Sequence, residues 1–184
     1  TEGMTINLSC SEDDLDRYSF DGYGYFEDCM ATEINLTGNL RVIGDSTFEG
    51  CTNLVRVTIP STVTEISGPA FSGCTALKSV TMPANLSSMG GSAFSGCTAL
   101  EEIALPDGVQ TIGNYAFSGC TNLRSIIIPL SVTEISRDAF ENCPRLTIYA
   151  EAESKPEDWV DGYVFENYLD WNPDDRPVIW GYRK

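Results

Sequence analysis

A phrase of eight residues recurs along this chain at a fixed spacing of 23 residues. Its clearest copy is Ala116-Phe117-Ser118-Gly119-Cys120-Thr121-Asn122-Leu123, and it returns at 93–100 and 70–77, with variants at 47–54 and 139–146. A period in the twenties is typical of a solenoid, in which each repeat forms one coil and stacked coils share a continuous core. The repeat therefore restricts the fold more than any other feature of the sequence.

Each repeat contains two short stretches of alternating apolar residues, which we interpret as two strands with inward-facing apolar side chains. Leu54 to Pro60 represents the first stretch, and its proline ends the strand because proline has no N–H to donate. Val63 to Ile66 represents the second stretch, on the opposite wall of the coil. Stacked coils place such strands in parallel sheets, with neighbouring strands about 4.8 Å apart.

The residue before each repeat cysteine is glycine in four copies and asparagine in the fifth, at positions 50, 73, 96, 119 and 142. Glycine and asparagine are the two residues that most readily accept a positive φ. We therefore expect a left-handed position there, which closes a short helical or 3₁₀ turn.

The phrase I-x-x-x-A-F-x-G-C-x-x-L-x-x-[VI]-x-[IL]-P resembles the BspA-like (Treponema pallidum-type) class of leucine-rich repeats. The tail, with Trp171-Asn172-Pro173 and the stretch 177–182, also looks like the terminal cap of such bacterial proteins, although Thr37 stands where the first coil should have proline. The resemblance implies an α/β-type repeat solenoid that is mostly β, with short helical or 3₁₀ turns. Such a solenoid would be a right-handed leucine-rich-repeat arc with parallel strands.

We expect three parts along the chain. An N-terminal cap covers 1–25, in which Thr5 to Leu8 alternates like a short strand. The solenoid covers 26–150 in five to six coils, and an aromatic C-terminal cap covers 151–184. The caps are required because the end coils of a solenoid would otherwise expose their apolar core.

Five of the seven cysteines stand in register with the repeat, and Cys29 extends the series. Neighbouring strands lie about 4.8 Å apart, whereas a disulfide brings its Cβ atoms to about 3.8 Å. We therefore predict a buried column of free thiols instead of bridges. Cys10 lies outside this register, and a Cys10–Cys29 bridge stays open as an alternative. The predicted column contains Cys29, Cys51, Cys74, Cys97, Cys120 and Cys143.

The net charge of −16 is concentrated at the two ends of the chain. Residues 1–37 carry nine acids against one base, and residues 150–184 carry nine acids against four bases. Such a field repels nucleic acid and anionic membranes, and no apolar run approaches the roughly 18 residues of a membrane helix. We interpret the charge as a source of solubility. Calcium binding by Glu12-Asp13-Asp14-Leu15-Asp16 is an alternative, although this stretch lacks the spacing and glycine of an EF-hand loop.

The sequence contains no histidine, which excludes Ser-His-Asp and Cys-His catalysis and histidine-based zinc sites. No CxxC motif is present, so a structural zinc site is not expected. Glu101 and Glu102 are neighbours on a predicted strand and point to opposite sides, which is poor geometry for a glycosidase pair. We therefore predict a non-enzymatic protein without a metal or cofactor.

The outward-facing strand positions are the candidates for binding. Lys78, Glu101 and Arg124 should stack on adjacent strands with alternating charge, either as a stabilising ladder or as part of a binding face. Ile127 is apolar where water is expected. The candidate face consists of Arg56, Thr58, Lys78, Ser79, Thr81, Glu101, Glu102, Arg124, Ser125 and Ile127.

The resemblance implies a function in adhesion, because BspA-like proteins are associated with the bacterial surface and with host matrix proteins such as fibronectin and fibrinogen. We expect a monomeric module, extracellular or at the cell surface, that binds a protein partner along its strands. One alternative is a carbohydrate-binding accessory module, and another is a structural spacer that displays a second domain. The carbohydrate alternative would use the aromatic residues Trp159, Tyr163, Phe165, Tyr168, Trp171, Trp180 and Tyr182.

Overall fold

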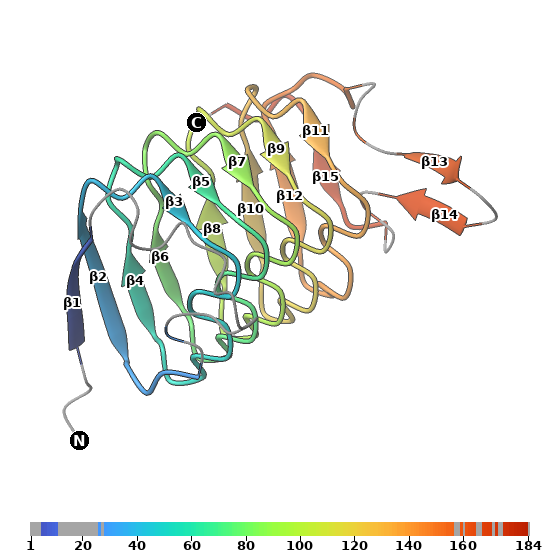
Figure 1. The fold of residues 1–184 in the computed structure, drawn as a ribbon. Coiled ribbons are helices and arrows are strands. Elements are labelled where there is room, and N and C mark those ends of the chain that lie inside the picture. Colours follow the sequence, from blue (N-terminus) through green and yellow to red (C-terminus); the bar gives the residue numbers. More distant parts are fainter. Residues whose placement is uncertain are drawn as a thin grey trace.

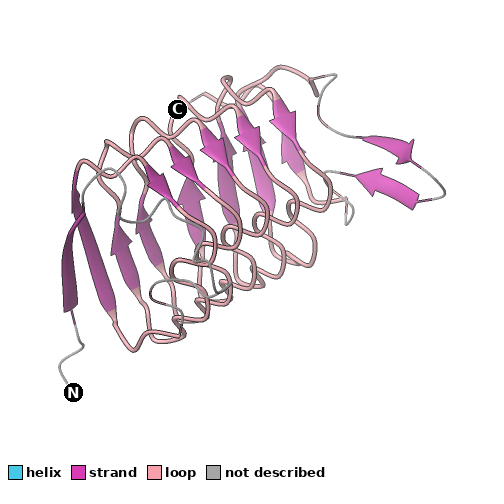
Figure 2. Cartoon of the chain, viewed as in Figure 1, coloured by secondary structure: helices cyan, strands magenta, loops and turns pink. Residues whose placement is uncertain are grey.

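The computed structural model describes residues 5–10, 26, 28–156, 159, 161–164, 167–170, 172 and 175–183. It shows a parallel β-solenoid of about five turns, as the repeat predicts (Figure 1). Each repeat contributes one strand to each of two facing walls. The described part of the chain contains no helix (Figure 2).

The first wall contains the strands that follow each repeat leucine, and all of its strand pairs are parallel. They form two separate four-stranded sheets, in the orders β1-β2-β4-β6 and β15-β12-β10-β8. β6 and β8 are neighbours along the solenoid, yet they are not hydrogen-bonded to each other, so the wall is interrupted between them. Its strands are β1 (Thr5–Cys10), β2 (Glu33–Gly38), β4 (Arg56–Thr58), β6 (Ser79–Thr81), β8 (Glu102–Ala104), β10 (Ser125–Ile128), β12 (Thr147–Ala150) and β15 (Val178–Ile179).

The second wall is a single parallel sheet, in the order β11-β9-β7-β5-β3. Its strands are β3 (Val42–Ile43), β5 (Glu65–Ile66), β7 (Ser88–Met89), β9 (Thr111–Ile112) and β11 (Glu134–Ile135). The remaining strands, β13 (Asp161–Val164) and β14 (Asn167–Asp170), pair with each other in an antiparallel sheet. The strand predicted at Thr5 to Leu8 is confirmed, and it extends to Cys10.

The space between the walls is filled by columns of identical side chains. Phe26, Phe48, Phe71, Phe94, Phe117 and Phe140 stack with ring centroids 5.2–5.9 Å apart and interplanar angles of 5–16°. Five of these rings are fully buried. A stacked aromatic pair contributes about 0.5–1.5 kcal/mol beyond its buried area, so each coil supports the next through this column.

The turn that contains each phenylalanine differs from the prediction. Gly50, Gly73, Gly96 and Gly119 have φ of 69° to 72° and Asn142 has φ of 56°, which confirms the left-handed position. The prediction of a helical or 3₁₀ turn is wrong for these residues, which form hydrogen-bonded turns.

The reason is that alternate N–H groups in the turn are used between coils. Phe71 N–H donates to the carbonyl of Ala93 at 2.8 Å, and Gly73 N–H donates to that of Ser95 at 2.8 Å. Each N–H is a single donor, so a donor bonded to the next coil is not available to a helix. Only isolated bonds within the coil remain, such as Cys74 N–H to the Phe71 carbonyl at 3.3 Å.

Candidate binding face

The ten predicted face residues all lie on or beside strands β4, β6, β8 and β10 of the first wall. Eight of them are exposed, while Ser125 and Ile127 are half-buried. The residues that alternate with them point inward, and Val57, Ile103 and Ile126 are buried. The strand pleat therefore separates an inner apolar set from an outer set that is free to make contacts.

The charges on this face are only partly paired. Arg56 lies 3.0 Å from Glu33, and Arg124 lies 3.6 Å from Glu101. Lys78 does not continue the expected ladder to Glu101, because the sheet is interrupted between their strands. Lys78 and Glu102 form no ion pair with any charged residue of the described part of the chain. Glu33 is not among the predicted face residues, although it precedes Arg56 by the repeat spacing of 23 residues.

One row of outward-facing residues changes character along the first wall. From β1 to β6 the row is polar, and the side-chain amide of Asn35 donates to that of Asn7 at 3.1 Å. From β8 to β15 the row is apolar, and Ile179 is 45% exposed at its end. In register order, the row consists of Asn7, Asn35, Thr58 and Thr81, followed by Ala104, Ile127, Tyr149 and Ile179.

We call Ala104, Ile127, Tyr149 and Ile179 the apolar row. The strand alternation predicted Ile127 as a surface residue, but it did not predict Tyr149 and Ile179. The repeat spacing pairs Ile127 with residue 150, whereas the structure pairs it with Tyr149. The last coil is one residue shorter at this point, so the spacing of 23 residues gives residue 150 in place of Tyr149.

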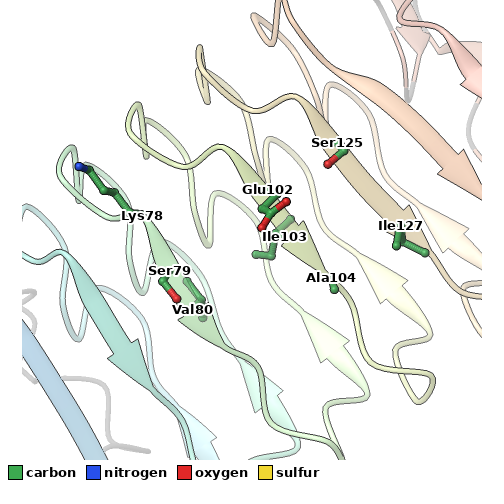
Figure 3. Close-up of a pocket in the computed structure, with 8 residues that line it drawn as sticks. All are labelled: Lys78, Ser79, Val80, Glu102, Ile103, Ala104, Ser125 and Ile127. Atoms are coloured by element: carbon green, nitrogen blue, oxygen red, sulfur yellow. The ribbon is translucent and has the colours of Figure 1, made fainter. Parts of the chain in front are cut away.

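The interruption between β6 and β8 forms a cleft of about 400 Å³. Figure 3 shows Lys78 and Ser79 on one side and Glu102 and Ala104 on the other. Val80 is half-buried at the cleft, while its register partner Val57 on β4 is 1% exposed. The cleft is lined by Lys78, Ser79, Val80, Glu102, Ile103, Ala104, Ser125 and Ile127.

The structure places the repeat cysteines in one interior column. Cys51, Cys74, Cys97, Cys120 and Cys143 are buried and free, and Cys29 is half-buried and free. Each buried thiol donates to the carbonyl of a phenylalanine on the preceding coil, as Cys97 does to Phe71 at 3.3 Å. The Cys10 side chain, which the alternative bridge to Cys29 would need, lies outside the described residues.

The environment of four of these thiols favours their protonated form. Burial raises the pKa of Cys97 well above 9.0, its ordinary value, and also raises that of Cys120. A hydrogen bond to Cys74, together with burial, raises the pKa of Cys51. Burial and a hydrogen bond to Cys51 raise the pKa of Cys29 to about 11. Since the thiolate is the nucleophile and the metal ligand, these cysteines are placed for packing and are poorly suited to catalysis.

Two of the three tryptophans are described, and both pack against the solenoid core. Trp159 is 1% exposed, and its indole N–H donates to the Val132 carbonyl at 3.3 Å. Trp180 lies 5.6 Å from it between ring centroids and is half-buried. The expected sugar platform therefore gains no fully exposed ring from either. The side chains of Tyr163, Phe165, Tyr168 and Trp171 lie outside the described residues.

Metal sites and membrane spans were also considered for the described residues. No group of three or more histidine, cysteine, aspartate or glutamate side chains is arranged to hold a metal ion there. The acidic stretch 12–16, the calcium alternative, lies outside that part of the chain. The described residues also contain no helix long and apolar enough to cross a bilayer.

Comparison with known proteins agrees with this geometry. Residues 22–147 match the model of the BspA-type leucine-rich repeat region in six copies. No curated protein matches the chain.

Three solved structures are similar over most of this chain. The T. pallidum leucine-rich repeat protein is 30% identical with a TM-score of 0.63, over 79% of this chain and 63% of that one. A leucine-rich cell surface protein from Faecalibacterium prausnitzii is 30% identical with a TM-score of 0.65, over 72% of this chain and 36% of that one. A leucine-rich repeat protein from Bacteroides ovatus is 29% identical with a TM-score of 0.57, over 89% and 52%. The chain thus spans between about a third and two thirds of these proteins.

Proposed function

Because this chain belongs to the BspA-type leucine-rich repeat family, we propose that it is a non-enzymatic recognition module of the bacterial cell surface. It binds a protein partner along its first wall and acts as a monomer. A surface location is supported by the similarity to the F. prausnitzii protein, which is itself a leucine-rich cell surface protein.

The observation that carries this proposal is the apolar row. Ala104, Ile127, Tyr149 and Ile179 are register neighbours on four adjacent strands, and they lie outside the core. Leu130, which is 64% exposed, follows β10 in the chain. Contiguous exposed apolar residues mark interaction sites, and tyrosine is among the residues that contribute most to binding at interfaces. The charged residues Arg124 and Glu101 beside this row supply the polar rim typical of a protein interface.

The test is a binding screen against immobilised matrix proteins, including fibronectin and fibrinogen, and against a glycan panel, with and without calcium. We expect binding to a protein, and we expect it to weaken roughly tenfold or more in Tyr149→Ser, as for a central interface residue. Glu134→Lys on the second wall is the control, because Glu134 is exposed on β11 and faces away from the apolar row. If Glu134→Lys abolishes binding and Tyr149→Ser leaves it intact, the partner binds the second wall and the proposal is overturned.

A display spacer is the second candidate, because the three similar structures are all longer than this chain, which spans 36% to 63% of their length. It predicts no binding to either panel. Glycan binding without protein binding would instead favour the carbohydrate alternative, with Trp171 as the first residue to change.

A further inference from the structure

The hydrogen-bond ladder of the first wall stops at the cleft. At the β2–β4, β4–β6 and β8–β10 junctions, the residue just before the later strand donates its N–H to the preceding coil. Lys78 N–H bonds the Val55 carbonyl at 3.0 Å, and Arg124 N–H bonds that of Glu101 at 2.8 Å. The corresponding bond from Glu101 N–H to the Lys78 carbonyl is not formed, and β6 and β8 are each the last strand of their sheet. Two open strand edges therefore face each other across the cleft.

The opening is confined to this wall. On the second wall the same two coils remain paired through β7 and β9, with Met89 opposite Ile112. The hydroxyls of Ser88 and Thr111 lie 3.1 Å apart on those strands. The phenylalanine column also continues, because Phe94 and Phe117 stack at 5.7 Å. The cleft is thus a recess held by an intact back wall, and not a break in the fold.

The cleft has an apolar floor and charges of both signs at its rim. Ile103 is 6% exposed and Val80 is half-buried, whereas Val57, the counterpart of Val80, is 1% exposed. Figure 3 shows Lys78 and Glu102 at different strands of the rim. Both are exposed, and neither has an ion-pair partner among the described residues. The volume of about 400 Å³ lies within the usual range of ligand sites.

These features point to a polypeptide as the occupant. An open strand edge offers repeating N–H and C=O groups, which another extended main chain pairs most completely. The lining contains no aromatic side chain on which a sugar or a base would stack. The unpaired Lys78 and Glu102 complement a segment that carries an acidic and a basic side chain.

We propose that the cleft between β6 and β8 is the anchoring site for an extended peptide segment of the protein partner. The segment pairs its main chain with an open strand edge and places an apolar side chain against Val80 and Ile103. Its flanking basic and acidic side chains pair with Glu102 and Lys78. This inference rests on the proposed function, because it specifies the site and the mode by which the protein partner is bound.

The first test selects binders from a displayed library of random linear peptides on the immobilised domain and measures their affinity for variants. Ala104→Trp fills the cleft from an exposed position, and Glu134→Trp is its control at an exposed position on β11 of the second wall. We expect Ala104→Trp to weaken the selected peptides roughly tenfold or more, and Glu134→Trp to change affinity less than about twofold. Lys78→Glu and Glu102→Lys should each weaken binding roughly fivefold or more, since an attractive pair becomes a repulsive one.

The second test is hydrogen exchange of the domain with and without a selected peptide. Main-chain pairing predicts slower amide exchange in 78–82 and 101–105 on binding, while amides of the second wall stay unchanged. A peptide that binds without protecting either segment would overturn main-chain pairing. Failure to select any peptide, or selected peptides that bind Ala104→Trp as tightly as the wild type, would overturn the cleft as a peptide site.

The matrix-protein screen separates this inference from the proposed function. If a matrix protein binds Ala104→Trp normally but loses Tyr149→Ser, protein recognition on the first wall stands and the cleft proposal fails. If no protein and no peptide binds the wild-type domain, both fail together.

Discussion

The two walls of the solenoid are built from the same repeat, yet only one of them is continuous. The second wall is one five-stranded sheet from β3 to β11. The first wall is two four-stranded sheets with a cleft between them, and its outward row is polar on one side of the cleft and apolar on the other.

This difference follows from which residues the repeat determines. Inward positions must fill the same space in every coil, so they repeat as leucine, phenylalanine and cysteine. Outward positions on both walls have no such requirement. They vary from Arg56 to Ser79 to Glu102 on the first wall, and from Val42 to Glu65 to Ser88 on the second. Stability therefore resides in the shared interior, while the recognition that we propose uses the variable outward positions of the first wall.

The largest effect that this comparison predicts is unfolding at alkaline pH, through the interior thiol column. Cys51, Cys97 and Cys120 have a raised pKa in the native state, whereas in the unfolded chain they ionise near 9.0. Their contribution to stability is complete below that pH and is lost as the pH rises, because only the unfolded state releases the protons. Each thiol costs about 1.4 kcal/mol per pH unit, or about 4 kcal/mol for the three.

Urea unfolding followed by circular dichroism at about pH 8 and about pH 10 measures this loss, and the linkage relation gives its expected size. Cys97→Ala is the control, because it removes one of the three thiols and should reduce the alkaline slope by about a third. An unchanged slope in that variant would show that the buried thiols do not govern alkaline stability.

The next largest effect is expected from a break in the phenylalanine column. Phe94 is fully buried and stacks on Phe71 at 5.2 Å and on Phe117 at 5.7 Å. Phe94→Ala should lower the free energy of unfolding by about 3–5 kcal/mol, as for other buried aromatic residues. Thermal unfolding measures the change, with Phe94→Leu as a milder variant that retains most of the volume. A loss below about 1 kcal/mol would mean that the coils do not depend on one continuous interior.

The sequence was sufficient for the features that every coil shares. The period alone predicts parallel stacking, the inward residues such as Phe94 and Leu100, and the left-handed residue before each cysteine. The prediction of helical or 3₁₀ turns was wrong, because the N–H groups of Phe71 and Gly73 donate to the next coil. The sequence of one repeat does not indicate such bonds between coils.

The candidate face was harder to predict, because it depends on differences between coils. The alternation placed Arg124 and Ile127 on the outer surface, and both lie there. The gap between β6 and β8 leaves no trace in the spacing of the sequence, since the coils on both sides have the standard length. Tyr149 was missed because the last coil is shorter. The period predicts the residues that every coil shares, whereas the features that we propose for binding lie where neighbouring coils differ.

A smaller effect is expected from crowding the second wall. An added Cβ at Gly113 would lie 2.6 Å from the carbonyl carbon of Gly90 and 2.6 Å from the nitrogen of Gly91. Gly113→Ala should therefore cost about 1–3 kcal/mol, because main chain cannot move aside as a flexible side chain does. Gly91→Ala is the matched control, with its nearest contact at 3.3 Å. Equal urea midpoints for the two variants would contradict the close packing of this wall.

The smallest effect on stability is expected at the exposed ion pair on the first wall, although we expect this pair to contribute to partner binding. Arg124 and Glu101 form an exposed pair at 3.6 Å, with side chains 62% and 60% exposed. Exposed pairs contribute about 0–1 kcal/mol, so Arg124→Ala should leave the free energy of unfolding within about 0.5 kcal/mol of the wild type.

A double-mutant cycle with Glu101→Ala, at low and high salt, isolates the coupling between the two charges. A coupling energy above about 2 kcal/mol would make the charge ladder a structural element. The outward charges of the first wall would then be needed for the fold, and their variation could no longer be assigned to recognition. A small coupling energy, together with weaker binding of a matrix protein by Arg124→Ala, would assign this charge on the first wall to binding and not to stability.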